Sequence, residues 1–335
     1  MATPRCRRVL VVANKNWEVA PLMDVLLEPR ACPPLFPWPT MLPPVQAWQA
    51  GSRPPKTPED IKKPHPRAVF RFEIQGGPSG AATVEVEVWC IQDWMAPPPT
   101  SSSSSFEKMR ILPSFFKWSA REDEPARPAD FVVAFGTAGF PTAISSYNGC
   151  VVVGANTFIF NAHAECPNPD SPWDDSGVKR PIPATLKKDF FSPSAGVFDD
   201  SLHAQIQARM ISPPNYPAER EMLIAAYNYT AVAAVNVTDY DEYAWADPKA
   251  LAEFGKVDQL NPAGSIETTH ALIRQQSDAP FLFVSAITDR EGGASAFNME
   301  VASRNYGQNF VAAHNGGVAV AWLLPKIAAY VAAQP

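Results

Sequence analysis

Two acidic side chains stand directly after apolar runs and are the residues best placed to do chemistry. Glu18 follows the run Val9–Ala13, and Asp289 follows the run Phe281–Ile287. Open α/β sheets bind ligands beyond the carboxyl ends of their strands, so residues at these positions can reach a bound molecule. At Asp289, a partly desolvated carboxyl at a strand end can have its pKa raised and act as a general acid. The structural alternatives are a first-turn helix residue for Glu18, and a helix N-cap or an ion-pair partner of Arg290 for Asp289.

A third candidate is the small-residue segment Gly136-Thr137-Ala138-Gly139, which follows the apolar run Phe131–Phe135. Small residues let backbone N–H groups approach a ligand closely. The same composition is typical of a tight turn, which is the structural alternative. No Gly-Lys-[Ser/Thr] follows, so the segment does not match a P-loop.

Metal sites and nucleophiles have less support. His163 lacks a standard metal-ligand spacing to Glu165 or His203. Cys150 lies inside an apolar run, where a thiol stays unreactive. Ser101–Ser105 lacks the Gly-x-Ser-x-Gly context of a serine hydrolase, and the chain has no Gly-x-Gly-x-x-Gly fingerprint. We therefore expect neither a metal nor an organic cofactor.

The composition excludes several classes of protein. The chain has 335 residues with 46% hydrophobic residues, as in a globular protein, and a net charge of −6 argues against a general nucleic-acid binder. Five cysteines without a C-x-x-C pair support neither a disulfide framework nor a cysteine-based zinc site. No continuous apolar run reaches the ~18 residues of a membrane span, and Val9–Ala13 is too short for a signal peptide. We expect a cytoplasmic protein that binds neither membrane nor nucleic acid.

Strands and helices are predicted to alternate along the chain. Apolar runs predict strands at 9–13, 69–74, 83–91, 131–135, 150–154, 157–160, 231–237 and 281–287. Helical spacing predicts helices at 17–27, 106–118, 203–210, 219–227, 265–276 and 310–330. This order predicts an α/β fold, a three-layer αβα sandwich with a mixed central sheet, as a single domain over residues 1–335.

The runs at 69–74 and 83–91 flank a glycine-rich segment and predict a hairpin. Alternation along the second run places valines on a buried face and Glu85 and Glu87 on a face exposed to water. The chain is longer than the predicted elements require, and the additional residues lie in proline-rich insertions near 29–66, 96–105 and 167–193. The first insertion is apolar enough to pack on the body, on a neighbouring subunit or over the pocket.

Together these segments resemble the nucleoside phosphorylase/nucleosidase superfamily, and within it the 5'-methylthioadenosine/S-adenosylhomocysteine nucleosidases. Residues 9–27 resemble the opening strand and acidic first helix of that group, and F-G-T-A-G (Phe135–Gly139) resembles its G-[ST]-A-G turn. S-I-E-T-T-H-A (Ser265–Ala271) resembles its M-E-[ATS] helix, and F-L-F-V-S-A-I-T-D (Phe281–Asp289) resembles its V-x-A-I-[ST]-D strand.

The resemblance implies a purine nucleosidase that cleaves the N-glycosidic bond of an adenosine or methylthioadenosine type of nucleoside. It implies that Glu18 activates water and that Asp289 is the general acid for the purine. The substrate-binding residues it implies are Ile266 and Glu267 at the ribose, Thr137, Ala138 and Gly139 along base and sugar, and Tyr240 or Tyr243 stacked on the base. It also implies a homodimer or a higher homo-oligomer.

The chain departs from the family pattern at three places, and two alternatives stay open. Gln92–Met95 leads into prolines and serines where the family has small, glycine-rich residues, Ser285 stands where the family often has arginine, and an early Gly-x-x-x-Arg is absent. One alternative is a phosphate-dependent nucleoside phosphorylase, with phosphate held by Arg121, Arg127 or a neighbouring subunit. The other is a non-catalytic relative that binds a nucleoside.

Overall fold

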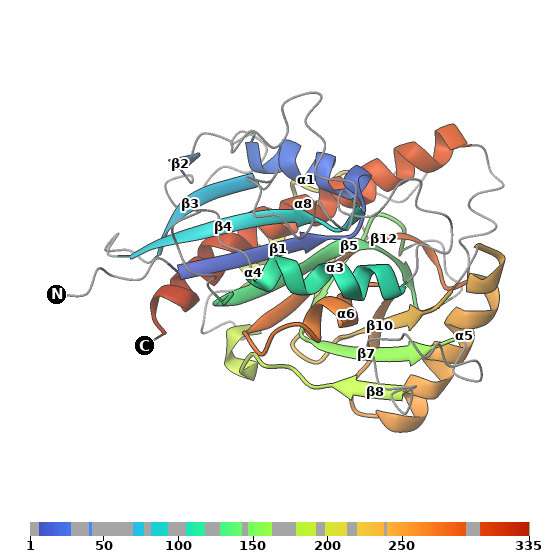
Figure 1. Cartoon of the computed structure of the whole chain (residues 1–335). Coiled ribbons are helices and arrows are strands. Elements are labelled where there is room, and N and C mark those ends of the chain that lie inside the picture. Colours follow the sequence, from blue (N-terminus) through green and yellow to red (C-terminus); the bar gives the residue numbers. More distant parts are fainter. Residues whose placement is uncertain are drawn as a thin grey trace.

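The computed structural model describes residues 7–27, 40–41, 70–76, 82–92, 105–117, 128–142, 147–162, 179–191, 198–212, 220–237, 240–292 and 302–334. In these ranges the strands form one 12-stranded mixed sheet, and helices cover both of its faces (Figure 1). The structure therefore confirms the three-layer αβα architecture. The expected insertion at 29–66 lies outside the described residues except for 40–41, and so do residues 96–104.

The first half of the sheet is built around the strand nearest the N-terminus. β1 (Arg7–Ala13) lies between β4 (Ala82–Cys90) and β5 (Phe131–Phe140) and runs parallel to both. Beyond β4 follow β3 (Phe70–Gly76) and β2 (Thr40–Met41), each antiparallel to its neighbour. The predicted hairpin is thus present as the antiparallel pair of β3 and β4.

The second half of the sheet is joined to the first through β5. β12 (Phe281–Arg290) runs parallel to β5, and β11 (Ala263–Glu267) meets β5 near its end. The path continues through β10 (Thr230–Val235), β7 (Asn156–Asn161) and β8 (Lys179–Ile182). β6 (Val151–Gly154) joins β12 to β9 (Leu223–Ala225).

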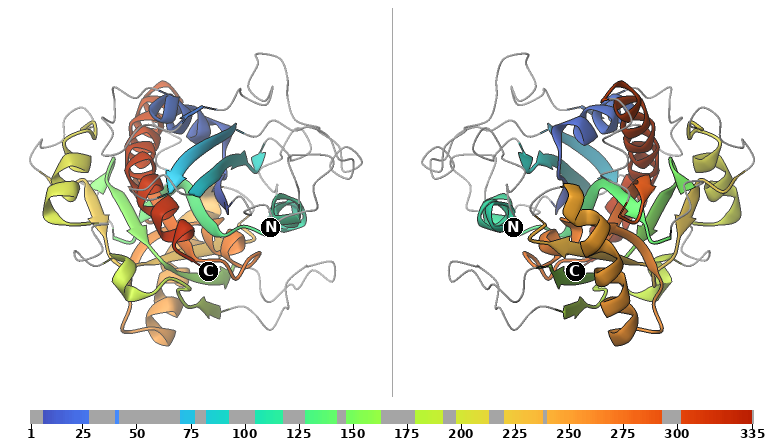
Figure 2. Two further views of the ribbon diagram at one scale, coloured as in Figure 1. Left: turned by 90° about the vertical axis from the view of Figure 1, so that its left-hand side faces the viewer. Right: turned by 90° about the vertical axis from the view of Figure 1, so that its right-hand side faces the viewer.

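Alternation along the strands divides the core between the two faces. Val9, Val11 and Ala13 of β1 pack with α1 (Asn16–Leu27) and α8 (Ala302–Ala332). Leu10 and Val12 pack on the other face with α3 (Ser105–Lys117) and α6 (His270–Arg274). Figure 2 shows α8 beside α1 on one side of the sheet and α3 on the other.

Three further helical segments complete the layers. α5 (Tyr240–Val257) packs through Ala246, Ala250 and Phe254 against β7 and β10. α4 (Asp200–Gln207) and the short 3₁₀ helix η4 (Lys188–Phe191) lie on the α1 and α8 face.

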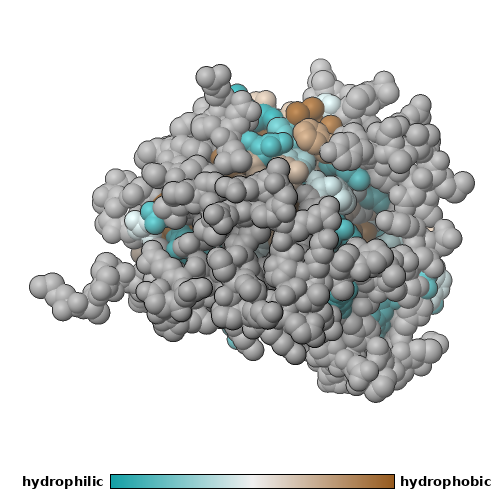
Figure 3. All heavy atoms as spheres, turned by 45° about the horizontal axis from the view of Figure 1, so that its top comes forward, coloured by the Kyte–Doolittle hydropathy of each residue, from teal (hydrophilic) through white to brown (hydrophobic). Residues whose placement is uncertain are grey.

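Helix α8 is long and apolar enough to resemble a membrane span by length and composition. Most of its apolar segment, Asn309–Ala332, is buried inside the fold. It contacts α1, β3, β5 and β12, so its apolar side chains serve the protein core. On the face that carries α1 and α8, the described residues in view mix hydrophilic and hydrophobic side chains (Figure 3).

The prediction that one face of β4 is exposed to water is wrong. Glu85 and Glu87 are 2% and 1% exposed. Glu87 pairs with the guanidinium of Arg8, with Nε–Oε1 at 3.0 Å and Nη2–Oε2 at 2.7 Å, and its Oε2 also accepts from Trp89 Nε1 at 2.8 Å. Trp89 on this face packs against Phe115 of α3, and Glu87 compensates a buried cation instead of marking a face exposed to water.

Several expected boundaries are also wrong. The segment predicted as a helix at 219–227 holds the strand β9, and the segment at 265–276 divides into the end of β11 and the short helix α6. The loop expected at 167–193 contains β8 and η4 within its described part. Residues 136–139 are not a turn, because β5 continues to Phe140 alongside β12.

Candidate active site

The candidate site lies along one edge of β5, between two strands that share that edge. β1 pairs with β5 as far as Phe135, and β11 pairs with it at Gly139. Among the described strands, none pairs with Gly136, Thr137 or Ala138 on that edge. The segment identified by its small residues is therefore a length of strand without a described strand partner on this edge, rather than a turn.

Glu18 occupies this edge because α1 begins directly after β1. The side chain is 1% exposed, and its carboxylate accepts four hydrogen bonds. Oε2 accepts from the backbone N–H groups of Asn14 at 3.1 Å and Lys15 at 2.7 Å. Oε1 accepts from the backbone N–H of Thr137 at 2.8 Å and its hydroxyl at 2.7 Å. Burial raises the pKa of Glu18, while the bonds from Thr137 and Lys15 oppose that rise.

Gly136 leaves room for two functional side chains on the same edge. A Cβ at this position would lie 3.3 Å from His270 Nε2 and 3.4 Å from Glu18 Oε1. His270 is 1% exposed, and burial together with Lys108 lowers its pKa to about 3, so the imidazole is neutral at pH 7. Its Nδ1 lies 3.3 Å from Ser285 Oγ, which fixes the ring.

Glu267 stands at the end of β11, not on a helix as the sequence resemblance implied. Its Oε2 accepts from the backbone N–H groups of Thr269 and His270, the latter at 2.8 Å. Its Oε1 is buried without a hydrogen-bond partner within the described part of the chain. Burial raises the pKa of Glu267 to about 7 against the effect of these amides and of Lys108, and Glu18 adds to the rise.

Asp289 lies within β12, opposite Gly139 of β5. The register shifts between Ile287 and Asp289, and such bulges re-aim a side chain. The carboxyl is partly buried and accepts from Thr288 Oγ1 at 2.7 Å. Burial raises its pKa to about 6, with the Thr288 bond acting in the other direction. A helix N-cap role for Asp289 is wrong, since it sits in a strand, and the side chain of Arg290 lies outside the described residues.

Helix α5 joins the strand of Asp289 through a second buried acid. Asp247 is 7% exposed, and its Oδ2 accepts from the backbone N–H of Gly292 at 3.0 Å. Burial raises the pKa of Asp247 to about 7, and the charges of Asp289 and Glu291 add to the rise. Gly292 has φ of +61°, and a Cβ there would lie 3.0 Å from Ala244 Cα, so α5 packs tightly on this turn.

The structure brings most of the predicted residues to the last part of β5, on its two edges. Glu18 is bonded to Thr137, and Gly139 is paired both with Ile266 on β11 and with Asp289 on β12. Glu18 and Glu267 also interact electrostatically. Tyr240 and Tyr243 begin α5, where Tyr243 is partly buried and the side chain of Tyr240 lies outside the described residues.

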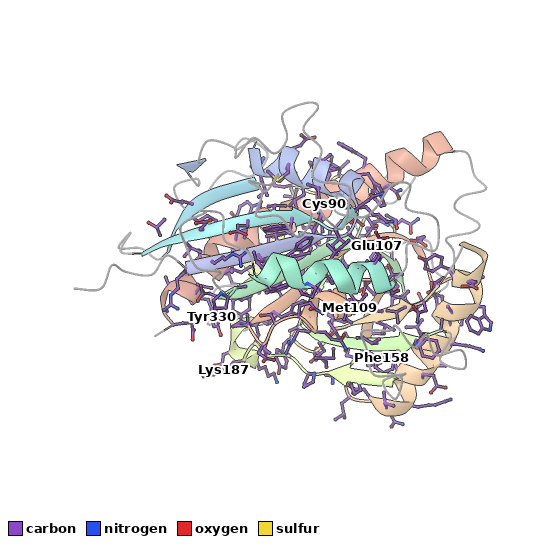
Figure 4. All side chains as sticks on the ribbon, in the orientation of Figure 1. Cys90, Glu107, Met109, Phe158, Lys187 and Tyr330 are labelled. Carbon is purple, nitrogen blue, oxygen red and sulfur yellow. The ribbon has the colours of Figure 1, made fainter. Side chains whose placement is uncertain are left out.

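Sequence reasoning missed three residues of the site, namely Lys108, His270 and Asp247. Lys108 carried a detectable signal, because it stands four and seven positions before Leu112 and Phe115 on the apolar stripe of its helix. Figure 4 shows the neighbouring Met109 on α3, and the Met109 sulfur lies 3.6 Å from Gln276 Nε2, just beyond α6. A lysine in such a stripe is either at the end of the core or paired inside it.

The side chains of Cys150 and His203 contact backbone carbonyls. Cys150 is buried, donates to the Glu221 carbonyl at 3.2 Å, and burial raises its pKa to about 11, as expected for an unreactive thiol. His203 Nε2 lies 2.8 Å from the Leu223 carbonyl. The described residues hold no group of three or more His, Cys, Asp or Glu that could bind a metal, and His163 lies outside them.

Comparisons with known proteins give matches among solved structures alone. No protein-family model matches the chain, and no curated protein matches it. The structure is similar to 5'-methylthioadenosine nucleosidase from Arabidopsis thaliana, at 13% identity and a TM-score of 0.46 over 98% of both chains.

Two similar structures come from Helicobacter pylori. The 5'-methylthioadenosine/S-adenosylhomocysteine nucleosidase, solved with butyl-thio-DADMe-Immucillin-A, has 10% identity and a TM-score of 0.47, over 95% of this chain and 98% of that one. A mutant of futalosine hydrolase has 8% identity and a TM-score of 0.44 over the same shares. Likeness at this level establishes neither a family nor an activity for the chain.

Proposed function

We propose that this protein is a purine nucleosidase of the nucleoside phosphorylase/nucleosidase superfamily, which hydrolyses an adenosine or methylthioadenosine type of nucleoside. The observation that carries the proposal is the convergence around residues 136–139 of β5 of three buried or partly buried carboxyls, with Glu18 and Glu267 on the edge shared by β1 and β11 and Asp289 on β12 along the opposite edge. Each carboxyl has a distinct environment, as a base, a sugar acceptor and an acid require.

In this reaction the bond from the sugar C1' to the purine nitrogen breaks through an oxocarbenium-like transition state, and a bond from C1' to the water oxygen forms. Asp289 gives its proton to the purine N7, so the base leaves as a neutral molecule. A pKa raised to about 6 leaves part of the Asp289 population protonated near neutral pH. Glu18 accepts the proton that water loses.

Glu18 can exchange one of its four hydrogen bonds for water without moving. Three of its donors are backbone N–H groups that cannot leave, whereas the Thr137 hydroxyl can rotate away. A carboxylate held in this manner keeps its orientation while it gains a proton, which lowers the cost of reaching the transition state.

Glu267 supplies the acceptor for the sugar. Its Oε1 is the atom without a protein partner, and a ribose hydroxyl would satisfy it. Ile266, Thr137, Ala138 and Gly139 would line the sugar and base, and Tyr240 or Tyr243 would stack on the purine. A homodimer or higher homo-oligomer remains a prediction, to be checked by light scattering after gel filtration.

The Asp289→Asn variant tests the proton donor. Asparagine keeps the shape and the polar contacts but cannot donate the proton, so we expect kcat to fall by a factor of about 10² or more while adenosine still raises the melting temperature. Purine release by a coupled ultraviolet assay measures the rate. An Asp289→Asn variant as active as wild type would exclude Asp289 as the acid.

Phosphate dependence separates hydrolysis from phosphorolysis. We expect purine release at the same rate with and without inorganic phosphate, because the carboxylate of Glu18, which this proposal places beside the reacting carbon, would repel a phosphate anion. Strict dependence on phosphate would replace the nucleosidase by a phosphorylase, with ligands such as Arg121 or Arg127. Binding of nucleosides without turnover would indicate a non-catalytic relative.

A further inference from the structure

Lys108 is a buried lysine that the proposed reaction does not yet use. It lies in the first turn of α3 and is 5% exposed. Its Nζ donates to Thr268 Oγ1 at 2.9 Å and to Thr269 Oγ1 at 2.8 Å, the two residues that follow Glu267. Burying an ammonium group is costly unless it has a specific partner, so the fold maintains this contact for a reason.

Helix α3 is anchored on both sides of Lys108. Ser105 Oγ, at the start of the helix, accepts from the backbone N–H of Asn236 at 2.9 Å. Near the other end, the Phe115 carbonyl accepts from Arg8 Nη2 at 2.9 Å, and Arg8 is itself paired with Glu87. These contacts tie the helix to the ends of β10 and to β1 and β4, and they leave Lys108 little freedom to move.

A chain of contacts leads from Lys108 to Glu267. Lys108 holds the hydroxyl of Thr269, and the backbone N–H of the same threonine donates to Glu267 Oε2. The lysine therefore orders the short segment whose amides orient the carboxylate. The free Oε1 of Glu267 is then presented in one fixed direction.

Lys108 and Glu267 also interact through their charges. Lys108 interacts electrostatically with Glu267, Glu18 and Lys15. Burial lowers the pKa of Lys108 to about 7, with Lys15 adding to the fall and the two glutamates opposing it. The neighbouring His270 is neutral at pH 7, so Lys108 and Lys15 are the cations that offset the two buried carboxyls within the described residues.

We propose that Lys108 is a positioning residue that keeps the Glu267 carboxylate ionised and aimed at the ribose hydroxyls, and thereby sets the affinity of the site for the sugar. This proposal rests on the proposed function of the site. It assigns to a residue of α3 control over the recognition of the ribose as opposed to the base.

The experiment compares Lys108→Met, Lys108→Arg and the control Lys256→Met, which removes a surface lysine that is 69% exposed. Kinetics with adenosine are measured from pH 5.5 to 9, and binding of adenosine and of adenine alone is measured by calorimetry. Methionine fills the volume of the lysine stem without the charge, and arginine retains the charge, so both variants are expected to fold. Circular dichroism melting checks each one.

For Lys108→Met we expect KM for adenosine at pH 7 to rise by about tenfold or more, with a smaller change in kcat and unchanged affinity for adenine. Without the cation, Glu267 gains a proton more easily, so KM should recover at a pH higher by about one unit. Lys108→Arg should stay within about threefold of wild type. Adding Lys108→Met to Glu267→Gln should cost nothing further in KM, since both act through one group.

The contrary results distinguish a failure of the Lys108 proposal from a failure of the proposed function. If wild-type protein releases purine but Lys108→Met behaves like Lys256→Met at every pH, Lys108 does not position Glu267. The same follows if Lys108→Met loses kcat and adenine affinity equally and arginine does not rescue it, since the role is then structural. If wild-type protein neither cleaves nor binds any purine nucleoside, the proposed function itself fails.

Discussion

Burial raises the pKa of Asp289, and a single hydroxyl next to it in the chain opposes that rise. Thr288 Oγ1 donates to Asp289 Oδ1 at 2.7 Å and also lies 3.4 Å from the Ala138 carbonyl. A hydrogen bond to the ionised carboxylate stabilises it and opposes the effect of burial on the pKa. Thr288 is the residue at the register shift of β12, directly before the proposed proton donor.

Replacing Thr288 by valine should make Asp289 a weaker acid. Valine has the shape of threonine without the hydroxyl, so the pKa of Asp289 should rise above about 6 by roughly half a unit to one unit. Because the acid must be protonated, the alkaline limb of the kcat profile should move to higher pH by the same amount. The matched control is Thr185→Val, whose hydroxyl donates to the Ala279 carbonyl at 3.0 Å. A limb that moves to lower pH would contradict the assignment.

Among the elements, α8 determines how α1 and therefore Glu18 are held. Two adjacent glycines in α8 face the layer that carries the site. A Cβ at Gly316 would lie 2.8 Å from the ring of Phe135, and one at Gly317 would lie 3.0 Å from the Cα of Leu22 in α1. The close approach of backbone to backbone at Gly317 leaves no flexible side chain to yield.

Replacing Gly317 with alanine should therefore destabilise the protein, although this substitution usually stabilises a helix. Glycine to alanine ordinarily stabilises a helix interior by about 1 kcal/mol. We expect Gly317→Ala to lower the free energy of unfolding by about 1–3 kcal/mol, because α1 must move away from α8. Gly255→Ala in α5 is the matched control, since nothing lies within 4 Å of its added Cβ, and it should stabilise the protein. Urea unfolding followed by circular dichroism measures both changes.

Over the whole molecule, the site concentrates carboxyls whose pKa values are raised in the folded state. The pKa of Asp247 is raised from 3.8 to about 7, that of Glu267 from 4.5 to about 7 and that of Asp289 from 3.8 to about 6. A group with a raised folded-state pKa contributes stability that is complete below its unfolded pKa and is lost as the pH rises through the folded value. These carboxyls therefore destabilise the fold progressively between about pH 4 and pH 7.

The Asp247→Asn variant should remove part of that loss. Asparagine can still accept from the Gly292 N–H but carries no charge, so the variant should melt about 2 °C or more above wild type at pH 8 and gain little at pH 4.5. Asp258→Asn is the opposite control, because hydrogen bonds from Asn261 and Leu260 lower the pKa of Asp258. Its stabilising contribution is present above about pH 4 and is lost as the pH falls. Calorimetric melting across pH distinguishes the two.

The sequence by itself determined the layers and the places where chemistry can occur. Continuous apolar runs such as Val9–Ala13 and Phe281–Ile287 have few other places in a folded chain than the interior of a sheet, so the strands and the carboxyls that follow them were predictable. The resemblance to nucleosidases added Glu267, which local patterns alone did not single out.

The tertiary structure alone decided which of these groups meet and in what electrostatic state. Glu87 alternates as a solvent-facing residue would, yet it is buried because Arg8 on the next strand compensates it. Residues 136–139 read as a turn and form a strand, because β12 supplies a partner along their whole length. Lys108 reaches Thr269 across 161 positions of sequence. Local sequence patterns do not show which distant residues become partners. The role of a buried charge depends on that partner.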